Sequence, residues 1–176
     1  MSAQQPKNLA APVRQRPLNR ARDRGEDCQL VLTCYAVERM LYRLGRSRHA
    51  GQFILKGAML LAAWEQLPHR PARDLDLLGY GDDALASVEG ALREIVRTNA
   101  EPDGLEFEER SIRGEEIRRD QEYRGVRTRL AARLAGARIP LQVGVAFGDA
   151  VSPAPQTLTY PALLDFSSIP APGQSP

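Results

Sequence analysis

The chain has 176 residues, 43% of them hydrophobic and 26% charged, which favours one globular domain and excludes a wholly disordered protein. No apolar run approaches the roughly 18 residues of a membrane helix, and the polar N-terminus lacks the apolar core of a signal peptide, so we expect a cytoplasmic protein with no membrane partner. Two cysteines and two histidines exclude a disulfide scaffold, a zinc site with four thiolates and a histidine-rich metal site.

The formal net charge of +2 is unevenly distributed. Residues 1–25 contain six basic residues and one acidic residue, a net charge of +5, so the rest of the chain has a net charge of −3. Such a basic segment either contacts the phosphates of a nucleic acid or forms a solvated helix. Pro17 lacks a backbone donor and would kink a helix, so residues 1–27 are predicted to be a basic arm or a broken helix.

Residues 28–149 are predicted to form the folded core. Their first segment repeats apolar side chains at spacings of three and four, at Val31, Cys34, Val37, Leu41 and Leu44. This spacing predicts a helix that ends at Gly45. Residues 52–56 are predicted to be a strand, followed by a turn at Gly57 and a helix that ends before Pro68.

Charged and apolar residues alternate in the next predicted strand, RDLDLLGY. The alternation turns Leu75 and Leu77 to one face, and Asp74 and Asp76 to the other. The remaining core is predicted as a helix, an edge strand, a polar connection and an antiparallel hairpin around Gly136, over residues 84–99, 105–113, 114–122 and 123–147. This order predicts an α+β fold, in which helices pack mainly on one face of a mixed or antiparallel sheet.

The last segment, residues 150–176, contains six prolines and no basic residue. Proline removes backbone donors, so this segment cannot hold a helix of any length. It is predicted to be a proline-rich tail that either straps across the core or is loose.

Asp74 and Asp76 form a candidate cation site. Residues two apart on a strand have α-carbons about 6.5 to 7 Å apart, so both carboxylates can reach one cation or an adjacent pair of cations. Two like charges about 4 Å apart cost on the order of 4 kcal/mol at an effective dielectric of about 20, so the pair needs a counter-ion or water. Mg²⁺ prefers oxygen ligands and also binds substrate phosphates. The alternative is a pair of solvent-facing acids on an edge strand.

The segment before this pair suggests a phosphate site. Lys56 ends an apolar strand, and Gly57 and Ala58 open the following helix, so backbone N–H groups and a lysine charge can approach a triphosphate. The alternative is a lysine at the end of a strand whose stem packs on apolar surface. Arg70 and Arg73 lie beside the aspartates, where they either bind phosphate or screen the carboxylates.

A phosphate-binding turn followed by an aspartate pair on the next strand is the arrangement of the nucleotidyltransferase superfamily. More closely, the chain resembles the AbiEii/AbiGii family of nucleotidyltransferase toxins, from type IV toxin–antitoxin and abortive-infection systems. The similar segments occur in order between Asn8 and Asp165: YAVERMLYRLGRS, FILKGAMLLAAW, RPARDLDLLG, DGLEFEERSIRGEEIR, YRGVRTRLAARL and RIPLQVGVAFGDAVSPAP.

The resemblance implies a nucleotidyltransferase-like fold and Mg²⁺-dependent transfer of a nucleotide from an NTP to RNA, for example tRNA, or to protein. It implies that Gly57 and Ala58 form the glycine motif and that Asp74 and Asp76 are the catalytic carboxylates that bind the metal. It also implies a cognate antitoxin as a partner. Lys56, Gly57, Ala58 and Arg73 together are the predicted nucleotide-binding residues.

The chain departs from the family pattern at several positions. Gly144 stands where the family usually has a third aspartate, and Ala72 where a threonine is common. Asp149 lies five residues beyond Gly144, on the opposite face of a continuous strand, so it cannot replace that carboxylate. The helical C-terminal part of the family, with a further lysine and aspartate, is expected to be absent. We therefore expect impaired activity; the alternatives are a non-catalytic module that binds RNA or an antitoxin, and a decayed fragment.

Overall fold

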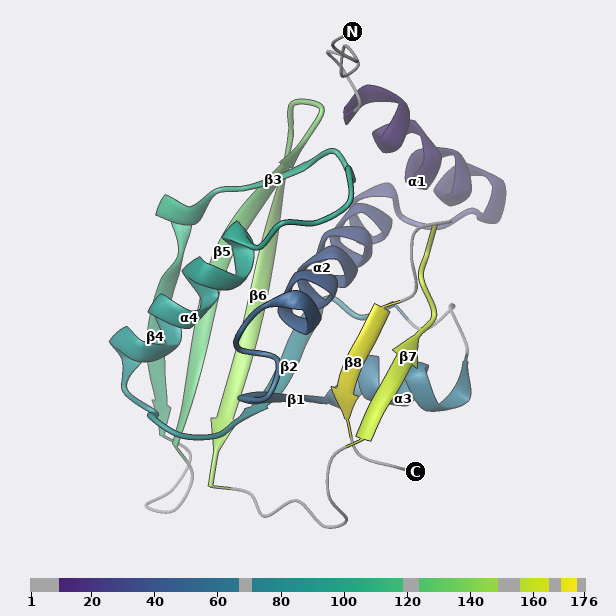
Figure 1. Cartoon of the computed structure of the whole chain (residues 1–176). Coiled ribbons are helices and arrows are strands. Elements are labelled where there is room, and N and C mark those ends of the chain that lie inside the picture. Colours follow the sequence, from purple (N-terminus) through teal and green to yellow (C-terminus); the bar gives the residue numbers. More distant parts are fainter. Residues whose placement is uncertain (1–9, 67–70, 119–123, 149–155, 165–168, 174–176) are drawn as a thin grey trace, which may run out of the picture.

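A computed structural model describes residues 10–66, 71–118, 124–148, 156–164 and 169–173 (Figure 1). In chain order, the elements in these ranges are α1 (Ala10–Arg24), α2 (Cys28–Arg46), β1 (Phe53–Lys56), α3 (Gly57–Glu65), β2 (Asp74–Gly79), α4 (Leu85–Arg97), β3 (Leu105–Phe107), a 3₁₀ turn (Glu109–Ser111), β4 (Arg113–Arg118), β5 (Arg124–Leu134), β6 (Ala137–Phe147), β7 (Gln156–Tyr160) and β8 (Ile169–Gly173).

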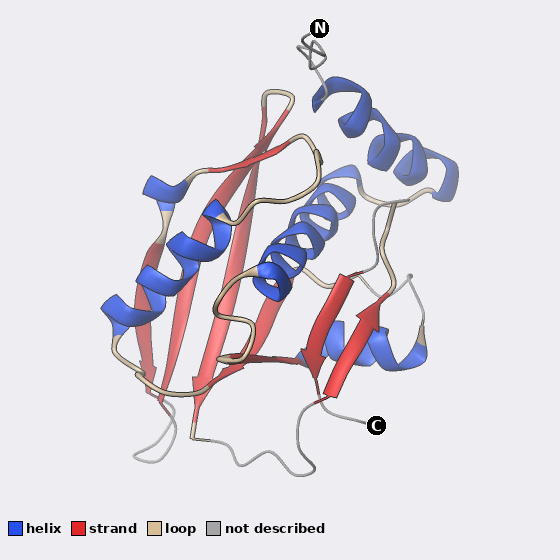
Figure 2. Cartoon of the chain, viewed as in Figure 1, coloured by secondary structure: helices blue, strands red, loops and turns tan. Residues whose placement is uncertain are grey.

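The strands form one mixed sheet in the order β3-β5-β6-β2-β1-β8-β7, and β4 pairs with β5 beside β3. The β2–β6 and β1–β8 pairs are parallel, whereas the other pairs are antiparallel. Helices α2 and α4 lie on one face of the sheet, and α3 lies behind β7 and β8 (Figure 2). The predicted α+β fold, with helices mainly on one face of a mixed sheet, is confirmed.

Helix α2 is the centre of the core. Asp27 caps its start by accepting a 2.7 Å hydrogen bond from the Leu30 N–H. Of the apolar stripe predicted from the sequence, Val37, Leu41 and Leu44 belong to the core, whereas Cys34 is half-buried. A fully buried leucine such as Leu41 contributes about 2 kcal/mol through removal from water. The helix continues through Gly45 and ends at Arg46, so the glycine does not terminate it as predicted.

Helix α1 runs through Pro17 without a break, so the prediction of a broken helix is wrong. Proline matches the φ angle of a helix and removes one backbone hydrogen bond. Pro17 is buried together with Val13 and Ala21, four residues to either side, and α1 packs on α2. This packing offsets the hydrogen bond that is lost at the proline.

Two segments that were predicted to be irregular are strands. Residues 114–118, predicted to be part of a polar connection, belong to β4 and pair with β5. The proline-rich tail supplies β7 and β8, which pair with each other, and β8 joins the sheet through Leu55 and Gly173. In the part of the chain that the structure describes, no helix combines the length and apolar character needed to cross a bilayer.

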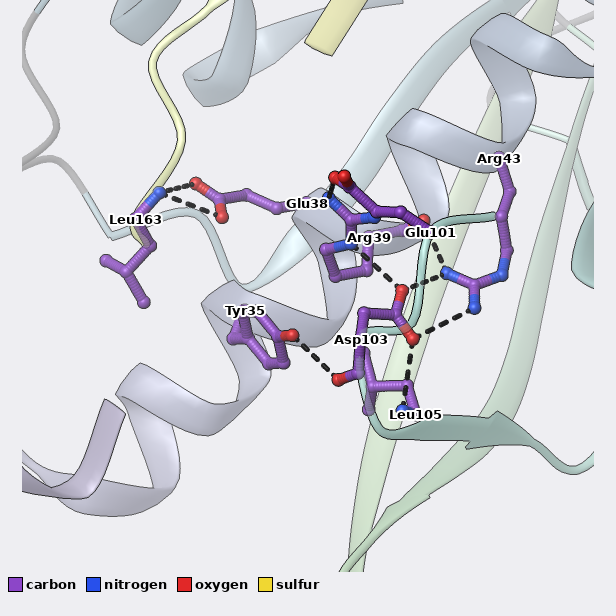
Figure 3. A network of polar contacts seen from close by, with 8 residues as sticks. All are labelled: Tyr35, Glu38, Arg39, Arg43, Glu101, Asp103, Leu105 and Leu163. Atoms are coloured by element: carbon purple, nitrogen blue, oxygen red, sulfur yellow. Dashed lines mark hydrogen bonds and ion pairs between the residues drawn. The ribbon is translucent and has the colours of Figure 1, made fainter. Parts of the chain in front are cut away.

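A buried polar network joins α2 to the turn before β3 (Figure 3). The Asp103 carboxylate, 3% exposed, accepts hydrogen bonds from Arg39 Nε at 2.9 Å and from Arg43 Nη1 at 2.7 Å. The Tyr35 hydroxyl donates to the carbonyl of Asp103 at 2.8 Å. This network fixes α2 against the β3 end of the sheet.

Helix α2 also carries a buried carboxylate of its own, Glu38, which binds the segment that follows β7. The Leu163 N–H donates to Glu38 Oε1 at 2.7 Å and to Oε2 at 3.0 Å (Figure 3). Burial raises the pKa of Glu38 to about 8, although the Leu163 N–H and the charge of Arg39 lower it. This contact and the pairing of β8 with β1 both attach the C-terminal strands to the core.

Candidate functional site

One row of paired residues crosses the sheet on the face opposite α2 and α4. Lys56 of β1 pairs with Asp76 of β2, Asp76 with Gly144 of β6, and Gly144 with Arg127 of β5. Directly paired residues turn their side chains to the same face of a sheet. The predicted alternation of β2 is confirmed, because its aspartates are exposed on this face while Leu75 and Leu77 are buried on the other.

Gly57 brings the start of α3 against Asp76. Its φ angle is +67°, a conformation that L side chains rarely adopt. A Cβ at this position would lie 2.5 Å from Asp76 Oδ2, so the backbone can approach the carboxylate only because residue 57 is glycine. The first N–H groups of a helix have no partner within the helix and carry partial positive charge. A helix terminus, an aspartate and the Lys56 side chain therefore converge at one point.

The electrostatics of the aspartate pair suit a cation. Partial burial raises the pKa of Asp76, the neighbouring Asp74 carboxylate raises it further, and Lys56 lowers it. A cation between the two carboxylates would relieve both effects, and carboxylate oxygens are the ligands that Mg²⁺ prefers. The described residues include no group of three or more histidine, cysteine or acidic side chains placed to hold a metal ion. The residues that could hold a Mg²⁺ here are Asp74 and Asp76, and water would have to supply the remaining ligands.

Gly144 lies where a third carboxylate would complete this group. A Cβ at Gly144 would lie 3.1 Å from Asp76 Oδ1 and would meet no other atom within 4 Å beyond its chain neighbours. An aspartate at this position would therefore point at the site after a small movement of Asp76. Asp149, which the sequence argument excluded as a substitute, lies outside the described residues.

Two cavities flank the aspartates. The first, of about 400 Å³, is lined by Lys56, Gly57, Asp76, Gly144 and Arg127, among others. The second, of about 720 Å³, is lined by Arg73, Asp74, Arg129 and Arg138 and by the start of α2. Gln142 lines both cavities.

The predicted site residues divide between these two cavities. Lys56, Gly57 and Asp76 lie together in the first, whereas Arg73 and Asp74 line the second. Ala58 is half-buried and packs against the core, so its side chain lines neither.

A known protein family matches most of the chain. The family model of the nucleotidyl transferase AbiEii toxin, from type IV toxin–antitoxin systems, matches residues 39–174. The chain belongs to the AbiEii nucleotidyltransferase toxin family. The match includes every candidate site residue named above, and it confirms the resemblance seen in the sequence. No curated protein matches the chain.

The residues of this AbiEii-family chain that line the cavities without having been predicted include Arg127 and Gln142. Arg127 and Gln142 reach the site through the β5–β6 hairpin, whose two-residue turn is Ala135 and Gly136, both with positive φ. When the pairs are counted outward from this turn, Arg127 pairs with Gly144, and Gln142 lies two residues before that glycine on β6. These two residues could therefore have been found from the predicted hairpin, but only if the residues of its turn, which set the strand register, had been known.

Proposed function

We propose that this chain is a Mg²⁺-dependent nucleotidyltransferase toxin that transfers a nucleotide from an NTP to RNA, with lower activity than a relative that has the third aspartate. The supporting observation is the close approach of the α3 N-terminus to Asp76, made possible by Gly57. This arrangement brings a group that attracts phosphate against a group that attracts metal, as transfer of a nucleotide from an NTP to a hydroxyl, with pyrophosphate leaving, requires.

The NTP is assigned to the 400 Å³ cavity. Lys56 would bind a phosphate as a point charge, and the N–H groups at the start of α3 would hold phosphate oxygens. Asp74 and Asp76 would hold the Mg²⁺, which neutralises the charge that develops on the phosphates. The role of the chain is to fix these groups on a rigid sheet, so that the reacting atoms start close together.

The acceptor is assigned to the 720 Å³ cavity, on the other side of the aspartate pair. An attacking hydroxyl must approach the phosphorus roughly in line with the departing pyrophosphate, which requires a second opening beside the carboxylates. Arg73, Arg129 and Arg138 line this opening, and arginine binds phosphate oxygens well. These three side chains favour RNA over protein as the acceptor. A cognate antitoxin, the partner that type IV systems imply, would suppress this activity.

Incubation with each labelled NTP, Mg²⁺ and total tRNA tests the proposal. We expect slow, EDTA-sensitive incorporation of label into a ribonuclease-sensitive product. Label in a protease-sensitive product would refute RNA as the acceptor, and no incorporation with any NTP would refute the proposed transfer. If RNA is retained without turnover, and retention disappears when residues 1–25 are removed, the chain is a binding module instead.

The Gly144→Asp variant tests the assigned metal geometry. We expect it to bind Mg²⁺ about tenfold more tightly, because a third carboxylate oxygen would face the cation beside Asp76. Calorimetric titration with Mg²⁺ measures the change, and Gly90→Asp, a glycine on α4 with open space around it, is the control. Equal Mg²⁺ affinities of Gly144→Asp and the wild type would contradict the geometry.

A further inference from the structure

Arg127 provides a positive charge on the NTP side of the site that has no assigned role. It lies in the row of Lys56, Asp76 and Gly144, separated from Asp76 only by the glycine. Neighbouring strands are about 4.8 Å apart, so its α-carbon lies about 10 Å from that of Asp76, a span that a long arginine side chain can largely cross. Gly144 contributes no side chain to fill the space between them.

The ion pair of Arg127 is weak. Its Nη1 lies 3.4 Å from Glu115 Oε1, and the same oxygen lies 3.4 Å from Arg129 Nη2. One carboxylate therefore faces two guanidinium groups, which leaves an excess of positive charge on this part of the sheet. Side-chain exposures of 36% for Arg127 and 49% for Glu115 keep the pair in contact with water, where such interactions contribute little. A phosphate could therefore displace Glu115 at small cost.

Among the charged residues that line the cavity, Lys56 and Arg127 provide positive charge on the face of the row and Asp76 provides negative charge, whereas Arg124 pairs with Asp83 at 3.4 Å. This excess of positive charge suits a triphosphate, and Lys56 and Arg127 stand at opposite ends of the row with the acid and the glycine between them. A ligand that spans the row would meet a cation at each end. The planar guanidinium can also bind two phosphate oxygens at once.

We infer that Arg127 binds the phosphates of the NTP, and that glycine at position 144 leaves the space through which it reaches them. A fixed guanidinium then supplies charge that a cation held by a third carboxylate would otherwise supply. This inference rests on the proposed function, since it assumes an NTP in this cavity. It predicts that part of the NTP affinity is independent of Mg²⁺.

The test is calorimetric titration with ATP, GTP, CTP and UTP, each in Mg²⁺ and in EDTA. For the NTP that binds, we expect the wild type to retain measurable affinity in EDTA and Arg127→Gln to bind about tenfold or more weakly in both conditions. The control is Arg133→Gln, on the same strand and face but six residues away, which loses an ion pair to Glu108 without lining either cavity. Melting temperatures of both variants close to that of the wild type show that neither loses its fold.

The inference and the proposed function fail differently. If the wild type binds an NTP in Mg²⁺ and Arg127→Gln matches Arg133→Gln, the role of Arg127 is refuted and the proposed function stands. The role of Arg127 is also refuted if NTP binding by the wild type disappears completely in EDTA. Absence of NTP binding in both conditions refutes the proposed function itself. Gly144→Asp provides a second variant: we expect it to weaken NTP binding in EDTA, because a carboxylate would stand between Arg127 and the phosphates.

Discussion

Replacing Asp76 with asparagine is expected to reduce nucleotidyl transfer by about a thousandfold or more while the chain remains folded. Asparagine keeps the size of the side chain but removes the negative charge that would bind Mg²⁺ beside the start of α3. The labelled-NTP assay measures the loss. Lost Mg²⁺ binding in calorimetry would show that the loss comes from the metal.

The stability of Asp76→Asn should distinguish loss of chemistry from loss of fold. The folded-state pKa of Asp76 is raised, so ionisation of this carboxylate costs stability as the pH rises above its ordinary pKa. Asparagine removes this cost, and the melting temperature at neutral pH should equal or exceed that of the wild type. The control is Asp23→Asn, an exposed site on α1, which should leave both properties unchanged. Full activity of Asp76→Asn would refute the assigned role.

The elements around the site could be predicted because they depend on local patterns. Alternation in β2 fixes which side of the sheet the aspartates face, and Gly57 marks the turn into α3. The sequence pattern could not show why residue 57 has to be glycine. That reason is the 2.5 Å approach of a hypothetical Cβ to a carboxylate nineteen residues further along the chain, which only the antiparallel β1–β2 register creates.

The segments that were predicted wrongly depend on partners distant in sequence. Strand β4 is mostly exposed and shows little apolar alternation, so its pairing with β5 is the interaction that makes it a strand. Strand β8 contains Pro170 and Pro172, which suggest an irregular tail. It is nevertheless a strand, with Ile169 and Ala171 fully buried and with β7 and β1 as its neighbours.

A buried carboxylate that stabilises the fold was also missed, because the pair Asp103-Gly104 is typical of an ordinary turn. Burial alone would raise the pKa of Asp103, but hydrogen bonds and charge from Arg43 and Arg39 outweigh it and hold the pKa below its ordinary value. This carboxylate therefore stabilises the fold at neutral pH, and its contribution is lost as the pH falls through the lowered pKa.

Replacing Asp103 with asparagine is expected to destabilise the chain by about 3–5 kcal/mol, because the buried Arg43 would lose its carboxylate partner and Arg39 would lose Asp103 while keeping Glu101 at 3.3 Å. Chemical denaturation at neutral pH measures the loss. The matched control is Asp83→Asn, which breaks a mostly exposed pair with Arg124 and should cost less than about 1 kcal/mol. The difference between the two variants should shrink in acid, where the Asp103 carboxylate is protonated. Equal destabilisation by both substitutions at neutral pH would show that the buried pair contributes no more than a surface one.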